Sequence, residues 1–272
     1  MMAALYVRMC QISPRFHKFS KRVMYQFMAK QYQKDDWTFM NYGFAHLEDA
    51  NEAPPLEARD EANRFCIQLY HHVANAVNLS GLKVLEVGSG RGGGAHYIKH
   101  YLKPRIMVGV DFSKNAVILC QKTHSMPGLQ FIPGDAENLP FDNQCFDAVV
   151  NVESSHCYSA MDSFLAEVKR VLRPGGHFLF ADFRDRERWD MLHEQLRRTD
   201  MAQIKQTDIT LNVIAALDQD HERKLAQITR GAPKLFVKLL QEFAGSKGSR
   251  IYKQFKNRSI VYQSFVLQKA GG

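Results

Sequence analysis

Lys83-Val-Leu-Glu-Val-Gly-Ser-Gly-Arg-Gly-Gly-Gly-Ala95 is the stretch that decides the fold of this 272-residue chain. Val84, Leu85 and Val87 form a short apolar run, which is typical of a buried parallel strand. Five of the next seven residues are glycines, and a helical pattern begins at Ala95. A strand, a glycine-rich turn and a helix place backbone N–H groups and a positive helix end where a ligand can approach.

The glycines also match a dinucleotide-binding pattern. Gly88, Gly90 and Gly93 satisfy G-x-G-x-x-G, which is weak evidence when it stands alone. Glu86 argues against a pyrophosphate, because a carboxylate at this strand end would repel the phosphates. A second acidic loop, Gly134-Asp-Ala-Glu137, follows the third expected strand. Such a loop suits an adenine amino group and a cationic sulfonium better than a dianionic pyrophosphate.

Strands and helices alternate between residues 82 and 182, as in a parallel sheet covered on both faces. We expect strands at Lys83–Val87, Ile106–Asp111, Leu129–Pro133, Phe146–Asn151 and His177–Asp182, and helices near Gly94–Leu102, Asn115–Thr123 and Met161–Leu172. The breaker Arg173–Gly176 should separate the last helix from the fifth strand. Ligands of such sheets bind at the carboxyl ends of the strands. Polar residues at or near those ends are Glu86, Asp111, Asp135, Asn151 and Asp182.

The pattern changes on either side of this region. Leu56–Leu79 predicts one long helix before the sheet, and Glu187–Arg198 another after it. Met201–Thr207 predicts a sixth strand and Ser259–Gln268 the last one. Two helices are expected between them, from Asp208 to about Arg230 and from Pro233 to about Ala244, as a cap over the ligand edge. We therefore expect a basic helical arm at 1–34 and one domain at 35–272, with a core at 82–208, a cap at about 209–245 and a final strand at about 259–268.

Five ordered motifs give this chain a clear resemblance to the class I S-adenosylmethionine-dependent methyltransferases. They are V-L-E-V-G-S-G-R-G at 84–92, V-G-V-D at 108–111, G-D-A-E-N-L-P-F at 134–141, F-D-A-V-V at 146–150 and L-R-P-G-G at 172–176. The resemblance implies an α/β fold, a doubly wound, seven-stranded, mostly parallel Rossmann-like sheet whose last strand is antiparallel to the sixth. It also implies S-adenosyl-L-methionine as cofactor.

The same resemblance supplies a set of cofactor contacts. Tyr42 lies in the aromatic-rich segment 36–44, which resembles the stretch that folds over the cofactor in small-molecule methyltransferases; burial in the core is the alternative for these aromatic side chains. The implied cofactor-binding residues are Tyr42, Glu86, Gly88, Ser89, Gly90, Asp111, Phe112, Asp135, Ala136, Glu137 and Asn151.

A candidate base follows the fourth expected strand, in Asn151-Val-Glu-Ser-Ser-His-Cys-Tyr158. Methyl transfer from a sulfonium to oxygen requires an in-line arrangement and the removal of one proton. His156 has an ordinary pKa near 6.5, which suits a general base. Asp182, at the end of the neighbouring strand, could orient the imidazole or bind the substrate hydroxyl. A hydrogen-bonded loop histidine without a catalytic role is the alternative.

From Trp37 onward the chain resembles O-methyltransferases of the phthiotriol/phenolphthiotriol dimycocerosate and rebeccamycin-glycoside types. Enzymes of the latter type have a catalytic histidine in this loop and an aspartate after the fifth strand. The resemblance implies that His156 and Asp182 are catalytic and that the acceptor is a hydroxyl of a small lipophilic or glycosylated molecule. C-methylation of a quinone- or sterol-like acceptor and a non-catalytic cofactor-binding protein are the alternatives.

Charge and cysteine content limit the other classes of function. The net charge is +8, but residues 1–34 contain seven Lys or Arg and no Asp or Glu, so the remainder is near neutral. We therefore expect no nucleic-acid partner. The amphipathic, basic arm could pack on the domain, form a homodimer, target an organelle or contact an anionic membrane. Five scattered cysteines favour a reducing cytoplasm and argue against a metal site or disulfides. No run approaches a membrane span.

Overall fold

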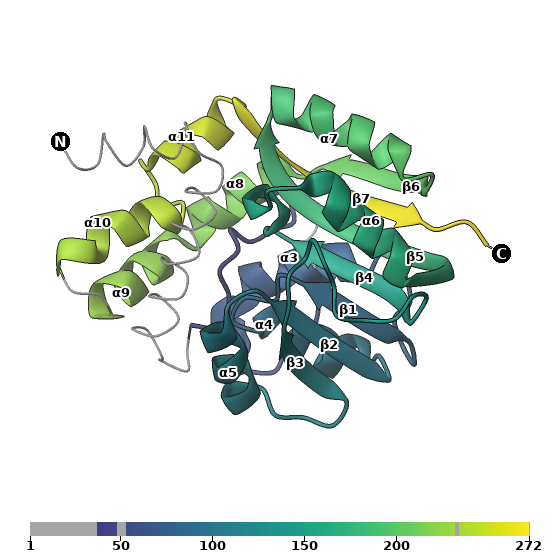
Figure 1. The fold of residues 1–272 in the computed structure, drawn as a ribbon. Helices are drawn as coiled ribbons and strands as arrows, with labels where there is room; N and C mark the ends of the chain where they lie inside the picture. Colours follow the sequence, from purple (N-terminus) through teal and green to yellow (C-terminus); the bar gives the residue numbers. More distant parts are fainter. Residues whose placement is uncertain (1–36, 48–52, 232–233, 272) are drawn as a thin grey trace.

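The computed structural model describes residues 37–47, 53–231 and 234–271 (Figure 1). Within them a single sheet has the order β3-β2-β1-β4-β5-β7-β6. The strands are β1 Lys83–Val87, β2 Ile106–Asp111, β3 Leu129–Pro133, β4 Phe146–Val152, β5 Leu172–Asp185, β6 Ala202–Asp208 and β7 Ile260–Gln268. Among them β7 alone runs in the opposite direction to the other six strands. The expected Rossmann-like sheet is confirmed, and the expected arm at 1–34 lies outside the described residues.

Two apolar cores lie on opposite faces of the sheet. Helices α3 Arg64–Ala74, α4 Gly93–Tyr97 and α5 Lys114–Thr123 contribute to one core, and α6 Met161–Val171 and α7 Arg186–Arg198 to the other. Strand β1 serves both, since Val84 belongs to the first core and Leu85 and Val87 to the second. Successive side chains of a strand point to opposite faces, so a continuous apolar run is needed where both faces are covered.

The cap contains more helices than the two expected. The described residues between β6 and β7 form α8 Thr210–Gln219, α9 His221–Gly231, α10 Lys234–Phe243 and α11 Arg250–Lys256, which lie together beside the sheet in Figure 1. The chain leaves the helical conformation at Asp220 (φ −92°, ψ 2°), whose carboxylate accepts hydrogen bonds from Arg223 at 2.5 and 2.6 Å. Gly245 and Gly248 have positive φ, and Ser249 caps α11 through its hydroxyl.

Two further expectations were wrong in their boundaries. The long helix expected from Leu56 is confined to α3, because a 3-10 turn at Glu61–Asn63 precedes it and Asn63 has a non-helical φ of −110°. The expected breaker Arg173–Gly176 lies inside β5, where the pairing with β4 shifts register and Gly175 has a φ of +77°. These residues form an irregularity in a strand rather than a separate turn.

The segment 37–45, here called the strap, crosses the glycine-rich turn without forming a helix or strand. The amide of Gly93 donates to the carbonyl of Thr38 at 3.2 Å, and the amide of Phe44 to the carbonyl of Phe65 at 2.9 Å. The guanidinium of Arg91 donates to the carbonyl of Trp37. These contacts attach the strap both to the turn after β1 and to α3.

We predict that Gly94→Ala destabilises the fold. A Cβ at Gly94 would lie 2.0 Å from Cε1 of Tyr70, whose hydroxyl is fixed by Glu86 at 2.6 Å. Helix propensity alone would favour alanine by about 1 kcal/mol. Overpacking usually costs ~1–3 kcal/mol, so a net loss is expected in urea denaturation. Gly271→Ala, with no heavy atom within 4 Å, is the control. A urea midpoint for Gly94→Ala as high as that of the parent protein would show that the Tyr70 ring moves aside without cost.

Candidate functional site

The turn after β1, the strap and the ends of β2, β3 and β4 enclose a cavity of about 200 Å³, here called the first cavity. Eight of the residues implied by the sequence resemblance line it. They are Gly88, Ser89, Gly90, Asp111, Phe112, Asp135, Ala136 and Glu137. The carboxyl ends of three neighbouring parallel strands therefore converge on one space, as expected of this kind of sheet.

Asp111 connects the glycine-rich turn to the following helix. Its carboxylate accepts hydrogen bonds from the amides of Gly90 and Ser113, both at 2.8 Å. Burial raises the pKa of Asp111 to about 6, although the two N–H donors oppose that shift. Each oxygen keeps a lone pair for a ligand hydroxyl, which suits the two hydroxyls of a ribose. The hydroxyl of Ser89 is buried and has no hydrogen-bond partner among the described residues. The acceptor oxygens of Asp111 and the hydroxyl of Ser89 together fit an adenosine ligand.

The acidic loop after β3 forms another wall of the first cavity. The Asp135 carboxylate accepts from the amide of Glu137 at 3.0 Å, which closes a tight turn. The Glu137 carboxylate accepts from the amides of Ser159 and Ala160 at 2.7 and 3.1 Å. Glu137 thus holds the loop that precedes α6, while it also lines the cavity.

Three other implied residues do not line the first cavity. Glu86 is fully buried beneath it, and burial raises the pKa of its carboxyl to about 7. The side-chain amide of Asn151 donates to the carbonyl of Val87 at 2.8 Å and thereby ties β4 to β1. The Tyr42 ring packs against Phe183 with a centroid separation of 5.3 Å, and Tyr42 lines a second cavity under the cap.

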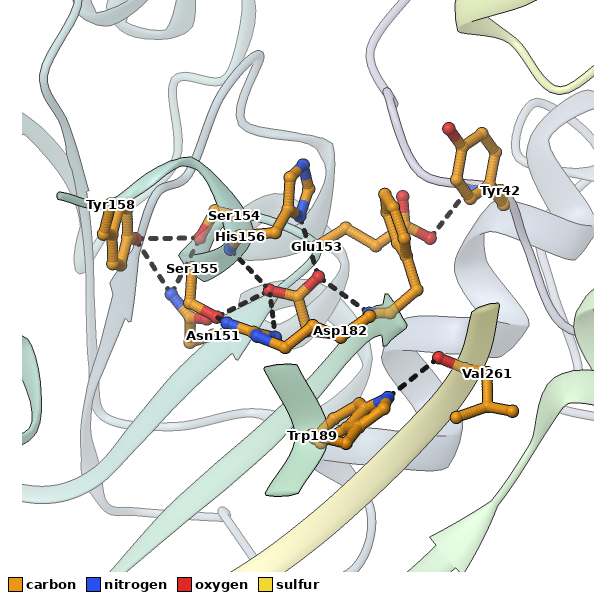
Figure 2. A network of polar contacts seen from close by, with 12 residues as sticks. Tyr42, Asn151, Glu153, Ser154, Ser155, His156, Tyr158, Asp182, Trp189 and Val261 are labelled. Atoms are coloured by element: carbon orange, nitrogen blue, oxygen red, sulfur yellow. Dashed lines mark hydrogen bonds and ion pairs between the residues drawn. The ribbon is translucent and has the colours of Figure 1, made fainter. Parts of the chain in front are cut away.

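His156 and Asp182 meet at the ends of β4 and β5 (Figure 2). The imidazole Nδ1 lies 2.8 Å from Oδ1 of Asp182. An ionised carboxylate only accepts hydrogen bonds, so Nδ1 carries the proton and Nε2 of the neutral ring has a free lone pair. The Asp182 side chain is 0% exposed and the His156 side chain is 19% exposed. The imidazole of His156 is therefore hydrogen-bonded to a buried carboxylate while part of the ring remains exposed.

Further donors fix the Asp182 carboxylate in place. It accepts from the hydroxyl of Ser155 at 2.6 Å and from the amides of His156 and Phe183 at 2.9 and 2.8 Å. Arg184 lies 3.3 Å from it and donates to the Ser155 hydroxyl at 2.8 Å. Burial alone would raise the pKa of Asp182, but His156 and Arg184 outweigh burial and hold the pKa well below its usual range. Asp182 is therefore ionised.

The Asp182 carboxylate in turn shifts the pKa of His156 upward. Burial lowers the pKa of the imidazole, but the neighbouring Cys157 and Asp182 outweigh burial and raise it to about 10. A raised pKa means that the free protein keeps the ring protonated through neutral pH. The neutral, proton-accepting form of His156 therefore becomes more abundant as the pH rises.

Sequence reasoning missed Glu153, which lines the first cavity. Its carboxylate accepts from the amide of Tyr42 at 2.9 Å, and burial, with Asp182 nearby, raises its pKa to about 7. Its backbone has a φ of +49°, which is uncommon for a residue with a Cβ. The only available signal was its position between Asn151 and His156. Ser154 and Tyr158, in the same segment, line the cavity as well.

The turn, the carboxylate after β2 and the acidic loop after β3 define a nucleoside-binding Rossmann-like site of the methyltransferase type. A sequence family described as "Methyltransferase domain" matches residues 85–180. A phthiotriol/phenolphthiotriol dimycocerosates methyltransferase of Mycobacterium leprae is 39% identical over 248 residues, which are 91% of either chain. A fatty-acid O-methyltransferase of Mycolicibacterium smegmatis is 35% identical over 250 residues, 92% of this chain and 90% of that one. The chain belongs to the class I S-adenosylmethionine-dependent methyltransferases, and S-adenosyl-L-methionine is its cofactor.

A solved structure supports the fold independently. The [4+2]-cyclase SpnF superposes with a TM-score of 0.68 at 19% identity, over 92% of this chain and 94% of that one. At this identity the likeness concerns the fold alone. In the parts of the chain that the structure describes, no cluster of three metal-ligating side chains occurs and no helix is long and apolar enough to cross a membrane.

We predict that Asp111→Ala weakens binding of S-adenosylhomocysteine, measured by isothermal titration calorimetry. Hydrogen bonds to a charged group contribute ~1.5–3 kcal/mol, so the loss should be on the order of 10- to 100-fold. Asp142→Ala removes an exposed carboxylate that does not line the cavity, and its affinity should match the parent protein. Equal affinities for both variants would contradict the ribose contact.

Proposed function

We propose that this enzyme transfers the methyl group of S-adenosyl-L-methionine to a hydroxyl of a small lipophilic acceptor, with His156 as the general base. The observation that carries the proposal is the 2.8 Å contact between Nδ1 of His156 and the buried carboxylate of Asp182. The two relatives above support the lipophilic acceptor, because one is named for a methyltransferase of phthiotriol-type lipids and the other for an O-methyltransferase of fatty acids.

The residues of the chain have separable tasks in this proposal. When bound, the cofactor would supply an electrophilic methyl group on its sulfonium, and the carbon–sulfur bond would break so that S-adenosylhomocysteine leaves. Nε2 of His156 takes the hydroxyl proton while the acceptor oxygen forms its bond to the methyl carbon. Asp182 keeps Nδ1 protonated, orients the ring and stabilises the imidazolium that results. The strap and the segment 152–158 exclude water around the reacting atoms.

Acceptor chemistry decides between this proposal and its alternatives. A carboxylate acceptor is already ionised and needs no base, and a quinone- or sterol-like acceptor would be methylated on carbon. A non-catalytic cofactor-binding protein would need neither residue. A neutral hydroxyl must lose its proton as the methyl group is transferred, so it requires a base beside the acceptor oxygen. The buried, fully hydrogen-bonded Asp182 behind an accessible imidazole favours the hydroxyl.

We predict that His156→Ala lowers kcat by ~10²–10⁴ with a hydroxyl acceptor, the loss expected when a general base is removed. Asp182→Asn should also lower kcat, because an amide cannot stabilise the imidazolium. If the two residues act as one unit, the double variant is little worse than the poorer single variant. Calorimetry with S-adenosylhomocysteine is the control, since its affinity should stay close to that of the parent. Near-normal turnover by His156→Ala would make His156 a structural loop residue.

The pH dependence provides a separate prediction. Activity requires the neutral imidazole, and the pKa of His156 is raised, so kcat/KM for the acceptor should fall as the pH decreases through that raised value. The acid limb is therefore expected above the ordinary histidine value of about 6.5. Asp182→Asn removes the charge that favours the imidazolium, so the limb should move to lower pH. A limb that stays in place in Asp182→Asn would show that another group titrates.

For residues 1–34, which lie outside the described residues, we propose a role in contact with an anionic membrane surface. The motivation is their seven basic and no acidic residues. A protein lacking residues 1–34 should retain cofactor affinity and lose sedimentation with vesicles of anionic phospholipid. Neutral vesicles are the control, and equal sedimentation of both proteins with anionic vesicles would exclude the role.

A further inference from the structure

A second cavity of about 290 Å³ lies between the strap, the start of α3 and the cap helices α9 and α10. Its apolar walls come from Trp37, Phe39, Ile228, Leu240 and Phe243. Ile228 and Leu240 are buried in a small cluster of their own, separate from the two cores that cover the sheet. This cluster surrounds a space that the two main cores do not fill.

The strap is the partition between the two cavities. Both cavities are lined by Trp37, Phe39, Met40 and Asn41. The partition is clamped at Tyr42, whose amide donates to Glu153 at 2.9 Å and whose carbonyl accepts from Lys224 at 3.0 Å. Glu153 lines the first cavity and Lys224 lines the second. One layer of chain therefore separates the cofactor cavity from the second cavity.

Asn41 presents an unused acceptor at this partition. Its side-chain amide nitrogen donates to the carbonyl of Cys66 at 3.2 Å, which identifies the other atom as the oxygen. That oxygen has no partner among the described residues, although Asn41 is only 8% exposed and lines both cavities. A buried amide oxygen without a partner costs free energy, so a ligand O–H or N–H at this point would be favoured.

The cations of the second cavity are largely neutralised by the protein. Arg223 binds the buried carboxylate of Asp220 through two nitrogens, and Lys224 lies 3.7 Å from the same carboxylate. Arg230 is exposed at the wall. Among the described residues, the inner part of the cavity thus offers apolar surface and no free cation to bind a carboxylate. A neutral aliphatic chain fits these walls better than an anionic group.

We propose that the second cavity binds the aliphatic chain of the acceptor, and that Asn41 accepts a hydrogen bond from the acceptor hydroxyl while the acceptor binds at the strap. A hydroxyl has one hydrogen to donate, so this contact is given up when the hydroxyl donates to Nε2 of His156 for methyl transfer. The inference rests on the proposed function, because it takes the acceptor to be a lipid alcohol. Helices α9 and α10 then limit the chain length that the enzyme accepts, and the strap positions the hydroxyl end of the acceptor.

The test measures binding rather than turnover, with dodecan-1-ol and hexan-1-ol as probes in the presence of S-adenosylhomocysteine. Apolar burial grows with each methylene, so dodecan-1-ol should bind at least ~10-fold more tightly to the parent protein. Ala226→Trp fills the second cavity from an exposed position on α9 and should weaken dodecan-1-ol on the order of tenfold, with hexan-1-ol little changed. Thr229→Trp adds the same side chain to α9 outside the cavity and is the matched control.

Unchanged dodecan-1-ol affinity in Ala226→Trp, or an equal loss in Thr229→Trp, would overturn the assignment of the cavity. Dodecyl methyl ether tests Asn41, because it has no O–H to donate. The alcohol should bind more tightly than the ether, and Asn41→Leu should abolish that difference between the two ligands. Equal affinity of the parent protein for alcohol and ether would overturn the contact. These readouts do not depend on methyl transfer, so failure of the proposed function would be seen separately, as absent turnover.

Discussion

The buried carboxylate of Asp182 is the interaction on which the arrangement of the site depends. A fully buried charge is costly unless hydrogen bonds and opposite charges surround it. Four donors and the guanidinium of Arg184 meet this requirement. Three of the donors belong to Ser155 and His156 in the loop after β4, and the carboxylate itself extends from β5. Satisfying Asp182 therefore fixes the loop, and with it the direction of the imidazole.

The strap connects this polar cluster to the cap. Glu153, in the loop that Asp182 fixes, holds the amide of Tyr42, while Lys224 of α9 holds the carbonyl of the same residue. Lys224 is itself placed by Asp220, the residue at which the chain turns from α8 into α9. The cap and the loop after β4 thus both hold the backbone of Tyr42. The two cavities share this wall.

The sheet could be predicted from sequence because its signals are local. Apolar runs such as Val84–Val87 and the glycines after them determine a strand and a turn without help from distant residues. The pairing of His156 with Asp182 followed from their positions at neighbouring strand ends. The cap was predicted less well, since the break at Asp220 depends on an ion pair with Arg223 that sequence periodicity does not reveal.

The role of Glu153 could not be predicted for a similar reason. A carboxylate in a loop after a strand is usually solvated, and its burial here arises only when the strap closes over it. Tyr42 illustrates the same limit, because an aromatic side chain before the first strand can face either cavity. Which one it faces depends on how α9 and α11 pack, and the Tyr42 ring lies against Phe255 of α11 at a centroid separation of 5.6 Å.

Charge balance links Glu153 to the proposed base. With the imidazole neutral, Asp182 and Arg184 leave the buried cluster without net charge, and a proton on His156 adds one positive charge. Burial raises the pKa of Glu153 to about 7, and the charge of His156 opposes part of that rise. The ionised form of Glu153 can therefore offset the positive charge on His156. A proton taken from a hydroxyl would enter a cluster that already contains carboxylates to stabilise it.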